Sequence, residues 1–144
     1  MSLHLQKLSV GSESIETLAD WQRRAVSRRM AGGLSPYHEH VTRMFPRRKD
    51  EILDGGSIYW VIKGIIQCRN RIVALDNVVR RDGIKACSIL MEPRPIPVVP
   101  IPKRPFQGWR YLKVEDAPDD LECVTGGQAL PPELRTRLLN LGAW

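Results

Sequence analysis

The sequence predicts an α+β fold in which a bent antiparallel sheet or a partly open small β-barrel carries two or three peripheral helices. Three observations support this fold class. Residues 57–91 alternate as successive hairpins do, both ends of the chain show helical apolar spacing, and eleven glycines with eleven prolines imply many turns. The chain of 144 residues has the length of one domain, so residues 1–144 are expected to share one core. A two-layer α+β sandwich is the alternative.

Apolar periodicity and turn residues divide the chain into successive elements. In order, these are a strand at 3–10, a helix at 15–30, a strand at 38–45, a short helix at 47–53, strands at 57–62, 65–79, 84–91 and 106–112, and a helix at 131–141. Ser12 or Ser14 can cap the first helix. Prolines recur from residue 93 to residue 105, so this segment is expected to be a covering strap or a linker outside the central sheet.

Positive charge is concentrated in the main body of the chain. The formal net charge is +6, but residues 1–113 hold 20 Lys and Arg against 10 Asp and Glu, whereas residues 114–144 hold 2 against 6. The two parts therefore carry +10 and −4. Such a field attracts polyanions, including nucleic acids, acidic proteins and phosphorylated metabolites.

Several classes of protein are excluded by what the sequence lacks. The N-terminus has no apolar secretion segment, and no apolar run approaches the ~20 residues that span a bilayer, so we expect a cytoplasmic protein with no membrane association. Three cysteines, an odd number with wide spacing, predict free thiols. The common phosphate loops, dinucleotide turns, zinc helices and nucleophile elbows are absent, so no cofactor and no metal is predicted.

His38 and His40 lie two residues apart in a predicted strand and should share one face. Such a pair can bind a metal ion or a phosphate, but no third ligand has diagnostic spacing, and His4 would supply one only through the fold. Residues 40–42 (HVT) also match the HxT signature of phosphodiesterases that use two such motifs, of which one copy is present. The enzyme alternative therefore combines His38 or His40 as proton carrier with Arg110 at a substrate phosphate.

Residues 105–113 (PFQGWRYLK) are the most distinctive stretch of the chain. Aromatic faces stack on bases and arginine binds phosphates, although Trp109 and Tyr111 are equally well explained as core aromatics. Because neighbours on a strand point to opposite faces, Trp109 and Arg110 are expected to divide between packing and ligand or solvent.

A positive stripe is expected where Arg69 and Arg71 share one face of a strand. The predicted ligand-binding residues are the following cationic and aromatic side chains: Arg43, Trp60, Lys63, Arg69, Arg71 and Arg110. The binding hypothesis requires Trp60 and Lys63 to converge with Trp109 and Arg110 on one pocket.

Three segments carry a resemblance to a known family: residues 40–44 (HVTRM), 53–64 (LDGGSIYWVIKG) and 105–113. With them the chain resembles, over nearly its whole length, an uncharacterised alphaproteobacterial family of domains of unknown function. This membership implies no known activity.

A second likeness involves residues 52–56 (ILDGG) followed by the strand at 57–62. This order is similar to that in PUA and ASCH domains, small β-barrels that bind RNA or modified bases, where a short helix and a glycine turn precede a strand that lines the cleft. The likeness implies a PUA-like barrel, with Tyr59 and Trp60 in place of the usual charged residue on that strand.

These features predict a protein that binds RNA or a nucleotide through a basic cleft containing aromatic side chains. The alternatives are the enzyme described above, acting on a phosphorylated or nucleotide substrate, and a protein-interaction module. The first two require a concave site, whereas an interaction module would show an exposed apolar patch.

Overall fold

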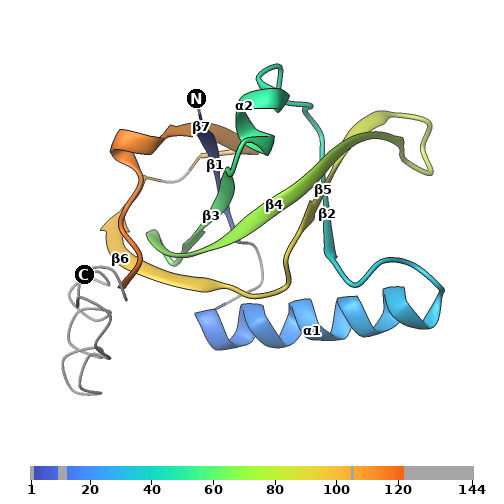
Figure 1. Ribbon diagram of the computed structural model, residues 1–144, viewed down its shortest axis with the longest axis horizontal. Helices are drawn as coiled ribbons and strands as arrows, with labels where there is room; N and C mark the ends of the chain where they lie inside the picture. The colour runs from blue at the N-terminus through green and yellow to red at the C-terminus, as the bar shows by residue number, and fades with distance from the viewer. Residues whose placement is uncertain (1, 10–12, 105, 122–144) are drawn as a thin grey trace.

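The computed structural model describes residues 2–9, 13–104 and 106–121. Its elements follow in chain order as β1 (Leu3–Leu8), α1 (Ile15–Ala31), β2 (His38–Thr42), α2 (Lys49–Leu53), β3 (Ser57–Ile62), β4 (Ile65–Val79), β5 (Lys85–Met91), β6 (Ile96–Pro102), β7 (Trp109–Lys113) and the 3₁₀ turn η1 (Val114–Asp116). Within these residues, strands predominate and two α-helices flank them (Figure 1), which confirms the mixed α+β class.

The strands form one bent, seven-stranded sheet that is not closed into a barrel. Its order is β2-β5-β4-β3-β1-β7, and β6 pairs with β4 off this path. β1 is parallel to β3, whereas the other described strand pairs are antiparallel. The expectation of an antiparallel sheet is therefore wrong at one pair, where the N-terminal strand enters between β3 and β7. Local alternation predicts a strand but not its distant partner.

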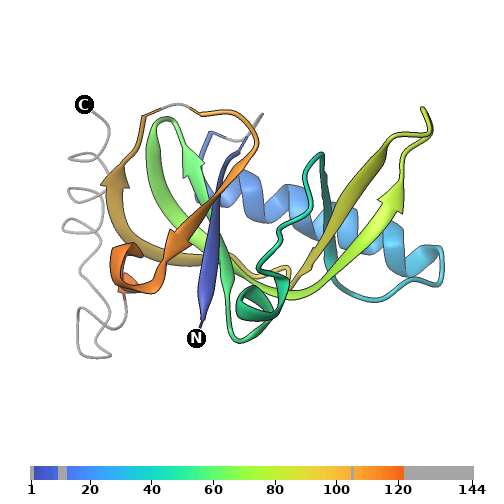
Figure 2. The same cartoon turned by 90° about the horizontal axis from the view of Figure 1, so that it is seen from above.

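β4 is the long strand that joins the two halves of the sheet and runs diagonally across the molecule (Figure 1). Residues 65–71 pair with β3, and residues 72–79 pair with β5. The register shifts between Ile72 and Ala74, and an irregularity of this kind bends a strand. As a result the β4–β5 hairpin extends to one side of the molecule, away from β6 and the β3–β4 turn (Figure 2).

Both faces of the central strands are covered, which explains why all six residues of β3 are buried. Ile58, Trp60 and Ile62 belong to the larger core, which includes side chains of α1 and α2. Tyr59 and Val61 belong to a smaller cluster shared with β6 and β7. We call these two sides of the sheet the helix face and the far face.

α1 is a half-buried helix whose observed end lies one residue beyond that of the helix predicted at 15–30. Ser14 is the N-cap, and its Oγ accepts a hydrogen bond from the Thr17 N–H at 3.1 Å. Leu18, Gln22 and Val26 recur at helical spacing on the buried side. In the described ranges, no helix has the length and apolar character needed to cross a membrane.

Other predicted elements differ in extent from those observed. β2 ends at Thr42 instead of Phe45, and α2 begins at Lys49 instead of residue 47. The proline-rich segment contains β6, so the expectation that it stays outside the sheet is wrong. β6 pairs with β4 on one side and makes a single bridge, between Val98 and Asp120, on the other. Prolines are tolerated in such a strand because few of its N–H groups are needed for pairing. The helix predicted at 131–141 lies outside the described residues.

A polar network crosses the larger core at Asn70. The Asn70 Oδ1 atom accepts hydrogen bonds from Trp60 Nε1 at 2.9 Å and from Gln22 Nε2 at 3.1 Å. Its Nδ2 group donates to Gln22 Oε1 at 2.9 Å and to the Glu92 carbonyl oxygen at 2.8 Å. Asn70 and Gln22 are fully buried, and every hydrogen-bonding position of the Asn70 amide is occupied. The network therefore ties α1 to β3, to β4 and to the chain that follows β5.

Removing the Asn70 amide should destabilise the protein strongly. In Asn70→Leu the polar groups of Trp60 and Gln22 would remain buried without partners, and each such group costs about 1–3 kcal/mol. We expect the free energy of unfolding, measured by urea denaturation, to fall by about 3 kcal/mol or more. Asn77→Leu is the matched control, because Asn77 lies exposed on the same strand, and it should change stability by less than about 0.5 kcal/mol. Equal losses in the two variants would show that the network contributes nothing specific.

Gly56 marks a close approach between the end of α2 and β1. Its N–H donates to the Ile52 carbonyl oxygen at 2.8 Å, and its own carbonyl oxygen accepts from the Ile72 N–H at 3.1 Å. A Cβ atom on Gly56 would lie 2.3 Å from the carbonyl oxygens of both Ile52 and Leu3. Any other residue at this position therefore forces the backbone of α2 and β1 apart.

Gly56→Ala should lower the melting temperature sharply, because two backbone oxygens must move to admit one methyl group. We expect a loss of roughly 2–3 kcal/mol or more in the free energy of unfolding. Gly32→Ala is the control: the nearest atom to its added Cβ is 3.6 Å away, and its φ of −88° suits any residue. Thermal melts of both variants test the steric argument, which fails if Gly56→Ala melts as the wild type does.

Candidate functional site

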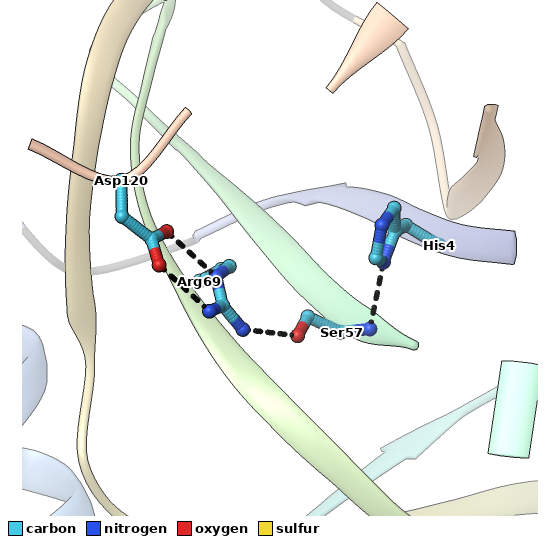
Figure 3. Close-up of polar contacts among 4 residues, drawn as sticks. All are labelled: His4, Ser57, Arg69 and Asp120. Atoms are coloured by element: carbon cyan, nitrogen blue, oxygen red, sulfur yellow. Dashed lines mark hydrogen bonds and ion pairs between the residues drawn. The ribbon is translucent and has the colours of Figure 1, made fainter. Parts of the chain in front are cut away.

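Arg69 organises a polar cluster on the far face of the sheet (Figure 3). Its Nε and Nη2 atoms donate to the two carboxylate oxygens of Asp120, each at 2.9 Å, and its Nη1 atom donates to Ser57 Oγ at 2.7 Å. The Ser57 N–H in turn donates to His4 Nδ1 at 2.9 Å. The ion-pair side chains are only 22% and 23% exposed, and bidentate pairs of this kind are strong. The Arg69 guanidinium, which the sequence analysis predicted as a ligand-binding group, joins the segment after η1 to β4.

His4 lies on the far face, where its ring meets Tyr59 edge-on with centroids 5.1 Å apart. Because Nδ1 accepts a hydrogen bond, the neutral ring carries its proton on Nε2. Burial lowers the pKa of His4 below its usual value. His40 contacts Trp60 on the helix face, so His4 does not complete a metal site with the strand histidines. Across the described residues, no group of three or more His, Cys, Asp or Glu side chains is placed to hold a metal.

Other predicted ligand residues are spread over the fold. Trp60 is only 2% exposed, and its indole N–H is bonded to Asn70. Lys63 occupies the exposed β3–β4 turn with a positive φ of 53°. Arg71 is exposed on β4, in register with Ser57. Lys63 and Arg71 are thus exposed to solvent, whereas Trp60 lies in the core.

Trp109 and Arg110 point to opposite faces of β7, as strand alternation predicts. Trp109 packs against the larger core, and its Nε1 donates to the Met44 carbonyl oxygen at 2.8 Å. The Arg110 guanidinium lies 5.3 Å from the ring centroid of Phe106, which packs against the far-face cluster. Trp60 therefore shares a face with Trp109 but not with Arg110. The strand histidines are also on the helix face, so the His–Arg combination of the enzyme alternative is not assembled.

Residues 43–49, which we call the basic segment, lie against β7 on the helix face. The segment contains four cationic residues and no acidic one: Arg43, Arg47, Arg48 and Lys49. The Arg48 N–H donates to the Tyr111 hydroxyl oxygen at 3.3 Å, and its guanidinium lies 5.8 Å from the centroid of the same ring. The rings of Trp109 and Tyr111 meet edge-on at 4.9 Å. The fold thus places a run of cations beside a pair of half-buried aromatic rings.

A cavity of about 460 Å³ opens beside Arg48, the residue whose guanidinium lies near the Tyr111 ring. Its lining comes from the start of β1 and the residue before it, the basic segment, the end of β7 and η1: Ser2, Leu3, Arg48, Lys113, Val114 and Glu115. Lys113 lies opposite Leu3 in the β1–β7 register. Arg48 also pairs with Glu51, and this hydrogen-bonded contact raises the pKa of Arg48 and lowers that of Glu51. The volume is that of a site for a small molecule or a single nucleotide.

Strand register places Lys7 between two tryptophans. Lys7 pairs with Trp60 of β3 on one side and with Trp109 of β7 on the other. Leu5, two residues earlier, faces the larger core, so the Lys7 side chain also starts from the helix face. The ring of His40 meets Trp60 edge-on with centroids 5.4 Å apart. Burial lowers the pKa of the Lys7 ammonium.

His38 and His40 are neutral histidines at the edge of the larger core. His38 is 1% exposed, and its ring meets Trp21 of α1 edge-on at 5.2 Å. Both ring nitrogens of His38 and the Nε2 atom of His40 are buried without a hydrogen-bond partner among the described residues. Burial is the main cause that lowers the pKa of each histidine to about 4.

Comparison with known proteins identifies a family. Residues 5–144 match the family described as protein of unknown function DUF1489. The chain belongs to this family. No curated protein and no solved structure matches it. The predicted membership in an uncharacterised family is confirmed, and the function has to be argued from the geometry of the side chains.

Sequence analysis missed Lys7 and Lys113 as candidate ligand residues. Lys113 was named only as the last residue of the stretch 105–113, although it alternates with Trp109 and Tyr111 and so shares their face. Lys7 interrupts a run in which Leu3 and Leu5 face the core. A lysine at an inward position of a strand is the signal that identifies it.

Acid should destabilise the protein through the two buried histidines. Their pKa values are lowered from 6.5 to about 4, so between these values the unfolded chain binds more protons than the folded one. This contribution is fully present above pH 6.5 and is lost as the pH falls toward 4. Urea unfolding should show a loss of roughly 1–2 kcal/mol per histidine between about pH 7 and pH 5. The slope should be shallower in His40→Gln, and an equal slope in this variant would contradict the assignment.

Proposed function

We propose that this protein binds RNA at the surface formed by the basic segment and β7, with a single nucleotide as the unit held in the adjacent cavity. The observation that carries the proposal is the 460 Å³ cavity lined by Arg48 and Lys113, of which Arg48 also lies beside the Tyr111 ring. Phosphate contacts from cations and stacking on aromatic rings are the two interactions by which proteins hold single-stranded RNA.

The charge distribution supports an anionic ligand at this surface. The cavity lining contains two cations against one acid, Glu115, and the basic segment adds Arg43, Arg47 and Lys49 at its border. Arg43 is the one sequence-predicted ligand residue that stays in the proposed interface. Phosphates of a longer RNA would follow the basic segment beyond the nucleotide in the cavity.

The aromatic pair supports base contact. Tyr111 and Trp109 are half-buried, so part of each ring remains available while the rest is fixed by packing. Hydrogen bonds from Arg48 and to Met44 hold the two rings in place, which lowers the entropic cost of stacking on them.

The likeness to PUA and ASCH domains also favours RNA. The observed order of α2, a glycine turn and β3 is similar to the order in those domains. Here β3 is buried on both faces, so the proposed interface uses the chain before α2 in place of that strand.

Loss of one cavity cation should weaken RNA binding without affecting the fold. Lys113→Gln and Arg48→Gln are each expected to raise the Kd for a short single-stranded RNA roughly threefold to tenfold at low salt. Each should also reduce the slope of log Kd against log salt by about 0.7, because one fewer counterion is released. Fluorescence anisotropy at several salt concentrations measures both quantities.

Arg110→Gln is the matched control for Lys113→Gln. Both are exposed cations on β7, but Arg110 lies on the far face. Its loss should leave the Kd within about twofold, and all variants should melt as the wild type does.

A titration with a nucleoside monophosphate distinguishes a single-nucleotide ligand from RNA. Equal weakening by both variants, or no RNA binding at low salt, would overturn the proposed interface.

A further inference from the structure

Lys7, His38 and His40 form a second group of polar side chains, which we call the lysine–histidine cluster. His40 and Lys7 both lie next to Trp60, and the charges of Lys7 and His38 both act on His40. Three ring nitrogens of this cluster are buried and have no partner in the described part of the chain. No hydrogen bond or ion pair with a described residue reaches the Lys7 ammonium either.

This lack of partners is unusual for buried polar atoms. Native folds pair the great majority of such groups, and an unpaired one lowers stability. In this molecule the nearby Asn70 network shows full pairing in the same core. A cluster of unpaired ring nitrogens beside a lysine ammonium therefore indicates a partner that is not part of the described chain.

The charges around the cluster select the sign of that partner. Lys7 faces His40, and Arg29 acts on His38, so the two cations nearest to the histidines repel a metal ion. Glu39 is the acid nearest to His38, but it alternates with the histidines along β2, and its carboxylate is bonded to Ser88 and lies 3.8 Å from Arg29. Two histidines without a third ligand among the described residues make a poor metal site.

We infer that the lysine–histidine cluster binds the oxyanion of a small ligand, a carboxylate or a phosphate group, between the Lys7 ammonium and the Nε2 atom of His40. Lys7 and His40 are each partly exposed as residues, whereas the Nε2 atom of His40 is buried, so an anion would approach this atom along the exposed parts of the two side chains. His38 lies deeper and extends the row of N–H donors inward. The rings of Trp60 and Trp109, on either side of Lys7, provide apolar walls for the rest of the ligand.

Proton uptake should accompany binding. An anion beside a neutral imidazole favours its protonated form, so bound ligand raises the pKa of His40 and, through it, that of His38. Affinity is therefore expected to increase as the pH falls below about 6 toward about 4, the range in which the histidines of the free protein begin to bind protons. The groups that face the cluster and enter this linkage are Lys7, Arg29 and Glu39.

The chain offers an internal reference for the experiment, because it contains three histidines and His4 lies on the far face. Ring ¹⁵N signals of the labelled full chain are followed while sodium phosphate or sodium acetate replaces sodium chloride at constant ionic strength. We expect saturable shifts and a rise of about one pKa unit at His38 and His40, with no change at His4. A response to one anion alone assigns the ligand group as phosphate or carboxylate.

Two variants separate this site from the proposed RNA surface. Lys7→Met keeps the aliphatic stem and should raise the Kd of the anion about tenfold or more, whereas Lys113→Gln should leave it unchanged. If Lys7→Met does not fold, the wild-type titration with His4 as reference still decides whether an anion binds at the lysine–histidine cluster. Absence of saturable shifts with both anions, equal shifts at His4, equal binding by Lys7→Met, or shifts produced only by zinc chloride would each overturn the inference. Failure of RNA binding would not affect it.

Discussion

The arrangement of the larger core depends on the side-chain amide of Asn70. This one group accepts from β3, exchanges two hydrogen bonds with α1 and donates to the chain after β5. A buried amide with four hydrogen bonds fixes orientation as well as distance, because each bond restricts the plane of the group. Gln22 contributes only if α1 presents that residue to the sheet, and Trp60 only if β3 has its observed register. Apolar packing alone would allow the helix to slide or rotate.

Fixing Asn70 toward the helix face also decides which neighbouring residues can have other roles. Arg69 must then point to the far face, where Asp120 and Ser57 engage it. Trp60 is held in the core, where it is buried and its indole N–H donates to Asn70. Arg69 and Trp60, which the sequence offers as ligand residues, thus hold the sheet to its neighbours. Arg69 joins it to the segment after η1, and Trp60 belongs to the network that joins it to α1. The cations that we propose for ligand binding lie instead on the chain between β2 and α2, at the end of β7 and within β1.

Local pattern predicted most strands and α1, since burial of one face imposes a period of two or of 3.6 on the sequence. It also predicted that Trp109 and Arg110 divide between the two faces of β7. The residues of the candidate site are brought together by pairing between strands that are distant in the sequence, which a local pattern does not predict. Pairing of β1 with β3 and β7 brings Lys7 between Trp60 and Trp109, although these residues are separated by most of the chain. Likewise, nothing local to residues 43–49 indicates that this segment lies against Tyr111. Register between distant strands depends on the whole core, so alternation in each strand leaves it open.

The position of β1 explains how one small sheet can present two cationic sites on the same face. Leu3 at one end lies opposite Lys113, and Lys7 at the other end lies opposite Trp109. Four residues of extended strand separate these ends by about 13 Å, which exceeds the reach of one phosphate or carboxylate group. The basic segment lies between them, with Met44 against Trp109 and Arg48 against Tyr111. A single small anion therefore cannot serve both ends of β1. In the proposed scheme, occupation of one end would leave the charge at the other uncompensated, so each site would take its own oxyanion.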